Sequence, residues 1–408
     1  MTSVFKIPAT ISRFGRLTLL LAASSISFIS CHSANTPSNA SQQSLFANAP
    51  GSPVSVQGGP GNVLIGDMNN DRKLDLVVAC ARARSITVIE GKGNGQFGAA
   101  LSNTTLAEAP GDMALGDLNG DGKLDVAVTS HDSYGVMLLT GDGKGGLAIA
   151  PASPIAMKMG QHPHTHGLAV ADINRDNKLD LITCNNADND ISIALGDGRG
   201  NFTRAAQPFP VGPSPYPFAV GDVNNDGWLD IVATASATGP SRREQLPLSR
   251  ALTLLLSDGK GGLAPHQLPL RTAEPWFAAI ADLNGDGRPD IVATHHEQSA
   301  MTVMIGDGRG GFTEANGSPL EVGGSVFQVI IADVDRDGST DIVATSGDSI
   351  RVLLGDGRGA FKPAAPIPVG PGAWRIAAAD LNGDGAVDVV TSNSESNSLS
   401  VLLALRQD

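Results

Sequence analysis

The pattern Asp-x-Asn-x-Asp-x-x-x-Asp occurs seven times along this chain, each time between two apolar stretches, with Asp335 replacing the asparagine in the sixth copy. The copies follow one another at intervals of 50, 55, 50, 60, 51 and 47 residues. A repeat of this kind indicates similar structural units that stack on their neighbours, which limits the possible folds more than any other feature. The first aspartates of the seven copies are Asp67, Asp117, Asp172, Asp222, Asp282, Asp333 and Asp380.

Each unit has the pattern of four short strands. In the fifth unit, residues 277–281 lead into the acidic loop and residues 290–294 lead out of it, so the loop joins two antiparallel strands. Residues 301–305 alternate apolar and polar, as a half-buried third strand does, and a glycine-rich turn at 306–312 opens a fourth. Only closed or radial architectures stack such sheets without long open edges, so the repeats predict an all-β, seven-bladed propeller.

The two ends of the chain predict how the ring closes. The last unit stops after its third strand, at 398–403. The stretch 45–56 has the pattern of a fourth strand, but no first, second and third strands precede it in the sequence. We therefore expect this stretch to complete the seventh blade, within a propeller that spans 45–408; the alternative is a disordered leader.

The N-terminal segment has the pattern of an export signal. Three basic residues precede the apolar run 17–29, which is too short to span a bilayer, so residues 1–31 are predicted to be a signal peptide. The residues directly before Cys31 resemble a bacterial lipobox, in which Cys31 would be lipidated and residues 32–44 would form a flexible tether. Ordinary cleavage is the alternative, so we expect a protein that is lipid-anchored in the bacterial cell envelope or secreted.

Charge and cysteine content exclude two classes of protein. The net charge of −13 argues against a nucleic-acid binder, because neutralising phosphates requires a surplus of lysine and arginine. Three cysteines cannot form a disulfide framework, and Cys80 and Cys184 fall in blades that are not neighbours. We expect both to be small buried residues.

The seven units resemble the FG-GAP/VCBS repeat family, whose best-known member is the propeller head of integrin alpha chains. The resemblance covers residues 45 to 405 and implies an integrin-alpha-like, seven-bladed β-propeller. Because functions in this family are diverse, the resemblance alone does not decide what the chain does.

The acidic loops have the spacing of calcium ligands. Positions 1, 3, 5 and 9 carry oxygen side chains and position 7 offers a backbone carbonyl, as in an EF-hand loop. Position 6 needs a sharp turn, which glycine supplies in five loops. In the third loop Asn177 tolerates the positive φ of such a turn, whereas for Arg72 in the first loop this conformation costs conformational energy. We therefore expect up to seven structural calcium ions, with the first site the weakest.

The alternative is a set of solvated Asp/Asn turns without metal. Against it, the loops hold 22 of the 41 acidic residues, three aspartates in each loop plus Asp335, and such clustering is costly without a counter-ion. The expected ligand side chains are Asp67, Asn69, Asp71, Asp75, Asp117, Asn119, Asp121, Asp125, Asp172, Asn174, Asp176, Asp180, Asp222, Asn224, Asp226, Asp230, Asp282, Asn284, Asp286, Asp290, Asp333, Asp335, Asp337, Asp341, Asp380, Asn382, Asp384 and Asp388.

The face opposite these loops is where we expect a ligand. The segments before each first strand and after each second strand lie on that face, and they are not repetitive. They collect six of the eight histidines, both tyrosines and two of the three tryptophans. The candidate ligand-binding residues are His131, His162, His164, His166, Asn185, Asp188, Tyr216, Trp276, His295, His296, Trp374 and Arg375.

These residues allow several kinds of chemistry. An extended backbone would point His162, His164 and His166 to one side, where they could hold a transition metal, contact another ligand or simply lie on the surface. Tryptophan rings beside an arginine suit sugar rings or anions, although ordinary packing near the channel mouth is the alternative.

Two functional classes follow. The favoured one is a monomeric, non-catalytic, cell-surface binding or adhesion module for a glycan or a protein. The alternative is an extracellular polysaccharide lyase or hydrolase with His164, His166 and His295 as acid/base candidates, although no catalytic motif is recognised.

Overall fold

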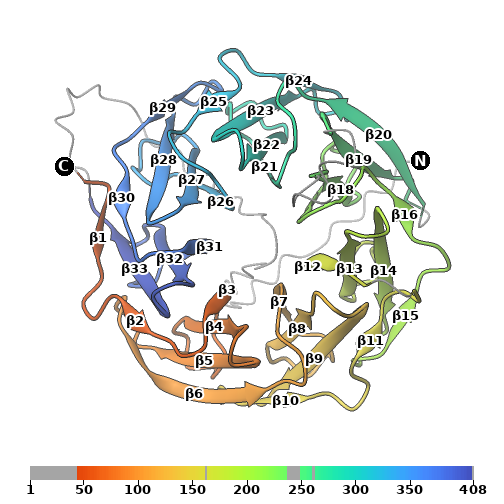
Figure 1. Cartoon of the computed structure of the whole chain (residues 1–408), viewed down its shortest axis with the longest axis vertical. Helices are drawn as coiled ribbons and strands as arrows, with labels where there is room; N and C mark the ends of the chain where they lie inside the picture. Colours follow the sequence, from red (N-terminus) through yellow and green to blue (C-terminus); the bar gives the residue numbers. More distant parts are fainter. Residues whose placement is uncertain (1–43, 161–162, 237–248, 260–261, 407–408) are drawn as a thin grey trace, which may run out of the picture.

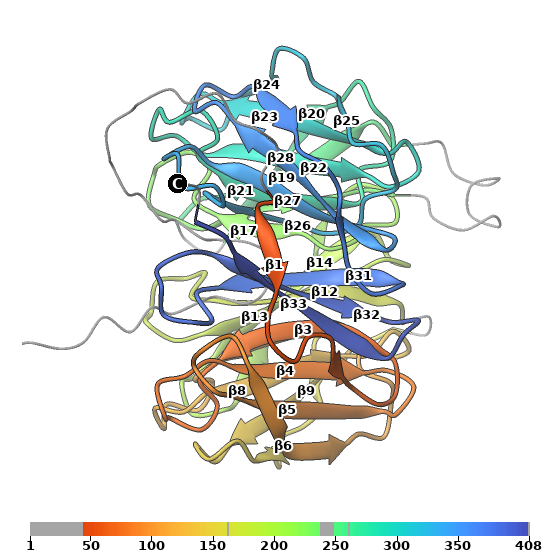
Figure 2. The same ribbon diagram turned by 90° about the vertical axis from the view of Figure 1, so that its left-hand side faces the viewer.

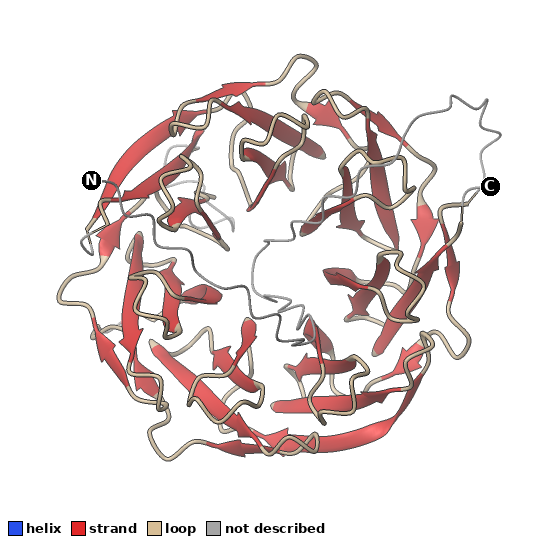
Figure 3. Cartoon of the chain, turned by 180° about the vertical axis from the view of Figure 1, so that it is seen from behind, coloured by secondary structure: helices blue, strands red, loops and turns tan. Residues whose placement is uncertain are grey.

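The computed structural model describes residues 44–160, 163–236, 249–259 and 262–406. Within these ranges the chain forms strands and loops without a helix (Figure 3). The strands make seven antiparallel sheets arranged radially around a central axis, and each sheet is one blade (Figure 1). The predicted seven-bladed, all-β propeller is therefore confirmed.

In every blade the first strand is innermost and the later strands lie progressively outward. Blades one to four contain β3 (Pro60–Gly66), β4 (Asp75–Cys80), β5 (Ser85–Gly91) and β6 (Phe97–Thr105); β7 (Met113–Gly116), β8 (Asp125–Thr129), β9 (Gly135–Gly141), β10 (Leu147–Ile149) and β11 (Ile155–Ala156); β12 (Thr165–Ala171), β13 (Asp180–Asn185), β14 (Asp190–Gly196), β15 (Phe202–Arg204) and β16 (Phe209–Pro210); β17 (Ala219–Gly221), β18 (Asp230–Ala233), β19 (Ala251–Ser257) and β20 (Leu263–Pro269).

The remaining blades contain β21 (Phe277–Ala281), β22 (Asp290–His295), β23 (Ala300–Gly306), β24 (Phe312–Glu314) and β25 (Leu320–Glu321); β26 (Val329–Ala332), β27 (Asp341–Ser346), β28 (Ser349–Gly355), β29 (Phe361–Pro363) and β30 (Ile367–Pro368); β31 (Ala373–Ala379), β32 (Asp388–Asn393) and β33 (Ser398–Ala404) with β1 (Phe46–Asn48) and β2 (Val54–Ser55). In five blades the outer strand is split into two short pieces, both of which pair with the third strand.

The N-terminal strands close the ring, as expected. β1 pairs antiparallel with β33, so that Phe46 lies opposite Ala404, and β2 pairs with the same strand further along (Figure 2). The first and last segments of the chain therefore share one sheet, and β33 has no open edge where β1 and β2 cover it.

The core consists of seven buried apolar clusters, one between each pair of neighbouring blades. In β21, Phe277, Ala279 and Ala281 face blade six. Ala278 and Ile280 face blade four. Both faces of an inner strand are thus covered, which explains why these strands read as continuous apolar runs.

The third strand of the fifth blade differs from its prediction. β23 is buried along nearly its whole length and not on one face alone. Thr302, which reads as an outward polar residue, is fully buried, and its hydroxyl lies 2.8 Å from Nε2 of His295. The polar residue in this alternating stretch is therefore not exposed to solvent. A neighbouring blade covers each face of the sheet, so Thr302 pairs with His295 in the interior.

Two smaller expectations concern the cysteines and the membrane. Cys80 and Cys184 are both free and fully buried, and each packs in a different apolar cluster. None of the segments that the structure describes forms a helix with the length and apolar character needed to cross a bilayer.

Candidate functional site

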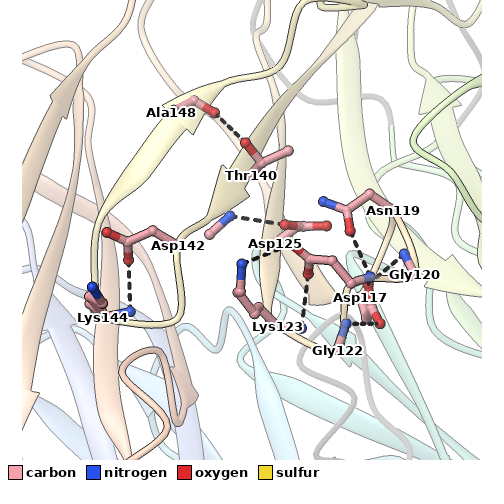
Figure 4. A network of polar contacts seen from close by, with 12 residues as sticks. Asp117, Asn119, Gly120, Gly122, Lys123, Asp125, Thr140, Asp142, Lys144 and Ala148 are labelled. Atoms are coloured by element: carbon pink, nitrogen blue, oxygen red, sulfur yellow. Dashed lines mark hydrogen bonds and ion pairs between the residues drawn. The ribbon is translucent and has the colours of Figure 1, made fainter.

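The acidic loops share one compact hydrogen-bonded conformation. In the second loop, Asp117 accepts the N–H groups of Asp121 and Gly122 at 3.1 and 2.8 Å, and Asn119 also accepts that of Asp121 at 2.9 Å (Figure 4). The carboxylates and the amide oxygen thereby turn toward the inside of the loop.

Two positions in every loop require positive φ, whereas the sequence pattern pointed only to position 6. Position 4 adopts the same left-handed conformation. The residues with positive φ are Asn70, Gly120, Arg175, Asn225, Gly285, Arg336 and Gly383 at position 4, and Arg72, Gly122, Asn177, Gly227, Gly287, Gly338 and Gly385 at position 6. Asparagine and glycine, which tolerate this conformation, account for most of them.

The aspartate at position 9 connects the loop to the rest of its blade. Asp125 is buried, and its two oxygens accept the N–H groups of Leu118 at 3.0 Å and Gly141 at 2.9 Å. The equivalent pair of bonds occurs in the other six blades. Burial raises the pKa of Asp125 to about 6, against the lowering effect of these two bonds. This carboxylate joins the loop to the end of the third strand.

The sixth loop has the densest cluster of carboxylates. Oxygen atoms of Asp333, Asp335 and Asp341 lie within 4.8 Å of one another, the single such trio among the described residues. Oδ1 of Asp333 is buried and accepts no hydrogen bond from the described part of the chain. Burial, together with neighbouring carboxylates, raises the pKa of Asp335. Hard oxygen donors with no cation beside them fit a calcium ion.

The left-handed residue in the first loop leads to a prediction about stability. Arg72 has a φ of 67°, which costs a residue with a side chain about 1 kcal/mol relative to glycine. We expect Arg72→Gly to raise the free energy of unfolding by about 0.5 to 1 kcal/mol, measured by calorimetry in calcium. Lys73→Gly, one residue further on and without positive φ, should lower it. A lower melting temperature for Arg72→Gly would contradict this account.

A second candidate site lies at the other end of the inner strands, at the mouth of the central channel. Five consecutive blades present a ring side chain at one position, six residues before the first loop aspartate. Across the seven blades this position holds Gly61, Gly111, His166, Tyr216, Trp276, Phe327 and Trp374. Phe327 was missed by sequence reasoning that looked for polar and tryptophan side chains; its constant offset from the acidic loop is the signal that identifies it.

The rings form a continuous row from blade two to blade seven. His166 stacks on Tyr216 with ring centroids 4.2 Å apart and an angle of 21° between the planes, and Tyr216 lies 4.1 Å from Trp276. The row is His131, His164, His166, Tyr216, Trp276, His296, Phe327 and Trp374, and successive centroids are 4.1 to 5.7 Å apart. Most of the predicted ligand-binding residues are thus brought together.

Backbone geometry fixes where these rings point. The pairing register shifts between His166 and Leu168, and again between Ala373 and Arg375, so the inner strand bulges at the ring position. Gly167 takes a φ of 69° within the first bulge, and an added Cβ there would lie 3.1 Å from Phe218. Bulges re-aim side chains next to them, which directs His166 and Trp374 into the row.

Hydroxyl groups in or just after the second strands tie three of the five ring residues to the preceding blade. Thr234 donates to the carbonyl of Trp276 at 3.3 Å, and Thr294 donates to that of Phe327 at 3.1 Å. Thr345 makes the same bond to Trp374 at 3.1 Å. These contacts hold the ring residues on rigid strands and couple their positions from blade to blade.

An ion pair spans the part of the mouth that carries no ring. The guanidinium of Arg375 in blade seven donates to Asp112 in blade two, and Asp112 also accepts the N–H of Gly167 at 2.7 Å. Burial opposes ionisation of Asp112, but Arg375, His166 and the Gly167 bond hold the pKa of this carboxyl below its ordinary value. Asp112 was not among the predicted residues.

The histidines of the row differ in burial. His166 is 6% exposed, and its Nε2 lies 2.9 Å from Nε2 of His164. Burial and the neighbouring imidazole of His131 lower the pKa of His166 to about 3, although Asp112 acts in the opposite direction. His166 is therefore neutral at physiological pH. His162 lies outside the described residues.

His295 and Asn185 lie apart from the row of rings, inside their own blades. His295 is fully buried, with Nδ1 2.8 Å from the Ala273 carbonyl, and burial lowers its pKa to about 4. Asn185 occupies the equivalent position in blade three and donates to Ser192 at 2.8 Å. Both side chains make a polar bond between the second and third strands of their own blade.

Asp188 lies in a separate network between blades two and three. Its carboxylate accepts the hydroxyl of Tyr134 and lies 3.2 Å from Nζ of Lys158, which also pairs with Asp190. These charges satisfy one another. Asp188 is thus held by side chains of blade two and is not part of the ring row.

Comparison with known proteins gives the family. The model of the FG-GAP-like repeat matches residues 67–128, 117–183, 172–233, 282–344 and 333–391. The chain belongs to the FG-GAP-like repeat family. Among curated relatives of this FG-GAP-like chain, cartilage acidic protein 1 of Mus musculus is 26% identical over 159 residues, which are 37% of this chain and 24% of that relative. The match thus spans about a quarter of the relative's length.

Solved structures share the propeller fold at low identity. The BBS1N chain from its complex with ARL6DN superposes with a TM-score of 0.59 at 11% identity, covering 90% of this chain and 99% of that one. A lectin of Agrocybe aegerita that recognises non-reducing terminal N-acetylglucosamine gives a TM-score of 0.53 at 18% identity, covering 83% and 86%. At these identities the likeness concerns the fold alone.

Proposed function

We propose that this FG-GAP-like propeller is an exported, calcium-stabilised module that binds a glycan at the mouth of its channel without catalysing a reaction. The observation that carries the proposal is the continuous row of eight rings on the non-repetitive face. A protein ligand is the alternative occupant of the same row.

The chemistry of the row suits a sugar better than a charged or purely apolar ligand. Trp374 is 36% exposed, and Tyr216, Trp276 and Phe327 are partly exposed. Aromatic faces pack against the C–H groups of sugar rings, while polar edges nearby bond to hydroxyls. His131 and the Arg375–Asp112 pair supply such polar edges at the border of the row.

Calcium is proposed on the loop face, with a structural role. The donor set of oxygens at positions 1, 3, 5 and 9, and the unpartnered Oδ1 of Asp333, support it. Bound calcium would supply the positive charge that the converging carboxylates lack. The loops lie at the far end of the inner strands from the ring row, so calcium would support the site without touching the ligand.

Export and lipidation stay proposals from the sequence. The predicted signal peptide, Cys31 and most of the predicted tether lie outside the described residues. A tethered propeller in the cell envelope, or a secreted one, would present the ring row to extracellular glycans.

The lyase or hydrolase alternative has less support. His295 is fully buried, with both nitrogens hydrogen-bonded, so it does not reach a substrate. Burial, with the neighbouring charges described above, lowers the pKa of His166 to about 3. A general acid must hold a proton near the working pH, which His166 does not.

The experiment is a pull-down of the calcium-loaded protein with soluble polysaccharides, in which mass spectrometry reads the chain length of bound and unbound material. We expect intact glycan on the wild type and at least tenfold weaker capture by Trp276→Ala, because a central aromatic contact is worth about 1.4 kcal/mol or more. Trp228→Ala is the matched control, since Trp228 lies in the fourth acidic loop, where Arg175 covers its ring at 4.9 Å. It should bind as the wild type does.

The other outcomes separate the alternatives. Shortened chains in the unbound fraction would make the protein an enzyme. Intact glycan captured equally by Trp276→Ala and the wild type would move the site away from the ring row. If no polysaccharide is captured, the proposal of a glycan ligand is wrong, and a protein ligand is the remaining alternative.

A further inference from the structure

Three imidazoles gather at one end of the ring row. His131 follows β8 in blade two, whereas His164 and His166 belong to the entry of β12 in blade three. Their ring centroids are 4.6 Å apart for His131 and His166, 4.6 Å for His164 and His166, and 5.7 Å for His131 and His164. The packing of two blades, and not sequence proximity alone, brings the trio together.

Two of the ring nitrogens already make a hydrogen bond with each other. Nε2 of His164 and Nε2 of His166 lie 2.9 Å apart. Metal–imidazole bonds of about 2.05 Å that meet at a right angle place two nitrogens about 2.9 Å apart, whereas a tetrahedral angle places them about 3.3 Å apart. The hydrogen bond alone accounts for the 2.9 Å spacing, so the spacing places both nitrogens within reach of one ion without selecting a metal.

The third nitrogen requires a side-chain movement. As placed, the sixth acidic loop is the single described group that brings three ligand atoms within 4.8 Å. His131 is exposed and lies in a connection after β8. Few neighbouring atoms therefore hinder rotation of its side chain, and its ring already lies beside that of His166.

Both signs of charge surround the trio. Asp112 accepts the N–H of Gly167, the residue next to His166, so a carboxylate is held close to the imidazoles. Arg375 already pairs with this carboxylate and offsets part of its charge.

We propose that His131, His164 and His166 form a site for one divalent transition-metal ion of the kind that imidazole binds, such as Cu²⁺, Ni²⁺ or Zn²⁺. Soft or borderline metals prefer imidazole nitrogen, whereas calcium prefers the oxygen donors of the acidic loops. The site lies beside Tyr216 in the ring row. The proposed metal site does not depend on whether the ring row binds a glycan.

The test titrates the full chain, produced without a histidine tag, with Cu²⁺ or Ni²⁺ in excess calcium, using equilibrium dialysis. We expect one tight site per chain, about 100-fold weaker in the double variant His164→Ala/His166→Ala. His266→Ala, on the exposed face of β20, is the control and should keep the site. Electron paramagnetic resonance of the Cu²⁺ form should show three coupled nitrogens in the wild type and two in His131→Ala.

The outcomes decide the proposal even if the double variant folds poorly. His131 is exposed, so His131→Ala is expected to keep the wild-type melting temperature, and its nitrogen count is the independent readout. Equal affinity in the wild type and the double variant would overturn the proposal. An unchanged nitrogen count in His131→Ala, or a site lost in His266→Ala, would do the same.

Discussion

Chelation of calcium is expected to lower the melting temperature by at least 20 °C. A site held at a hundred times its dissociation constant stabilises the fold by about 2.7 kcal/mol, so five to seven sites contribute about 13 to 19 kcal/mol. This exceeds the total stability of many domains. At about 0.7 kcal/mol per degree for a chain of this size, the melting temperature should shift by about 20 to 27 °C. Calorimetry with calcium and with a chelator measures the shift.

Magnesium should not restore the lost stability, because it needs a tighter octahedral shell and gives up its water reluctantly. A single-site variant sharpens the test. Asp337→Asn, at position 5 of the sixth loop, should lower the melting temperature by about 4 °C in calcium and leave it unchanged in chelator. Asp348→Asn, an exposed aspartate outside the loops, should change neither. An unchanged melt of the wild type in chelator would contradict the calcium sites.

The fold could be predicted because its information is local and repeated. Each loop carries its own turn residues, and its aspartates at positions 1, 5 and 9 identify the hairpin without knowledge of the other blades. Closure followed from counting strands, since a blade with three strands at one end needs the orphan strand at the other. The pairing of Phe46 with Ala404 is the direct result.

The candidate ligand site was predicted only in part because its geometry arises between blades. The topology correctly placed Tyr216, Trp276 and Trp374 at the mouth, but their contacts depend on how neighbouring inner strands converge. His295 lies only one residue before His296, which does join the row. Successive residues of a strand point to opposite faces, and only the packed blade shows which face is the core.

The strand that closes the ring carries the second large prediction. Phe46 in β1 is 3% exposed and packs in the apolar cluster between blades six and seven, together with Val343 and Leu402. Replacement by alanine removes this contact at the joint between the two ends of the chain. Truncating a buried phenylalanine costs about 3 to 5 kcal/mol, so Phe46→Ala should lower the melting temperature by about 4 to 7 °C.

The matched control is Asn48→Ala, an exposed residue of the same strand, which keeps the β1–β33 hydrogen bonds and should melt as the wild type does. Hydrogen exchange locates the effect. If β1 closes the ring, Phe46→Ala should speed exchange at Leu402 and its neighbours in β33 more than in β22 of blade five, because only the seventh blade depends on this strand. Equal acceleration in both blades would show that the ring opens as one unit. An unchanged melting temperature would show that β1 is not needed to hold the ring closed.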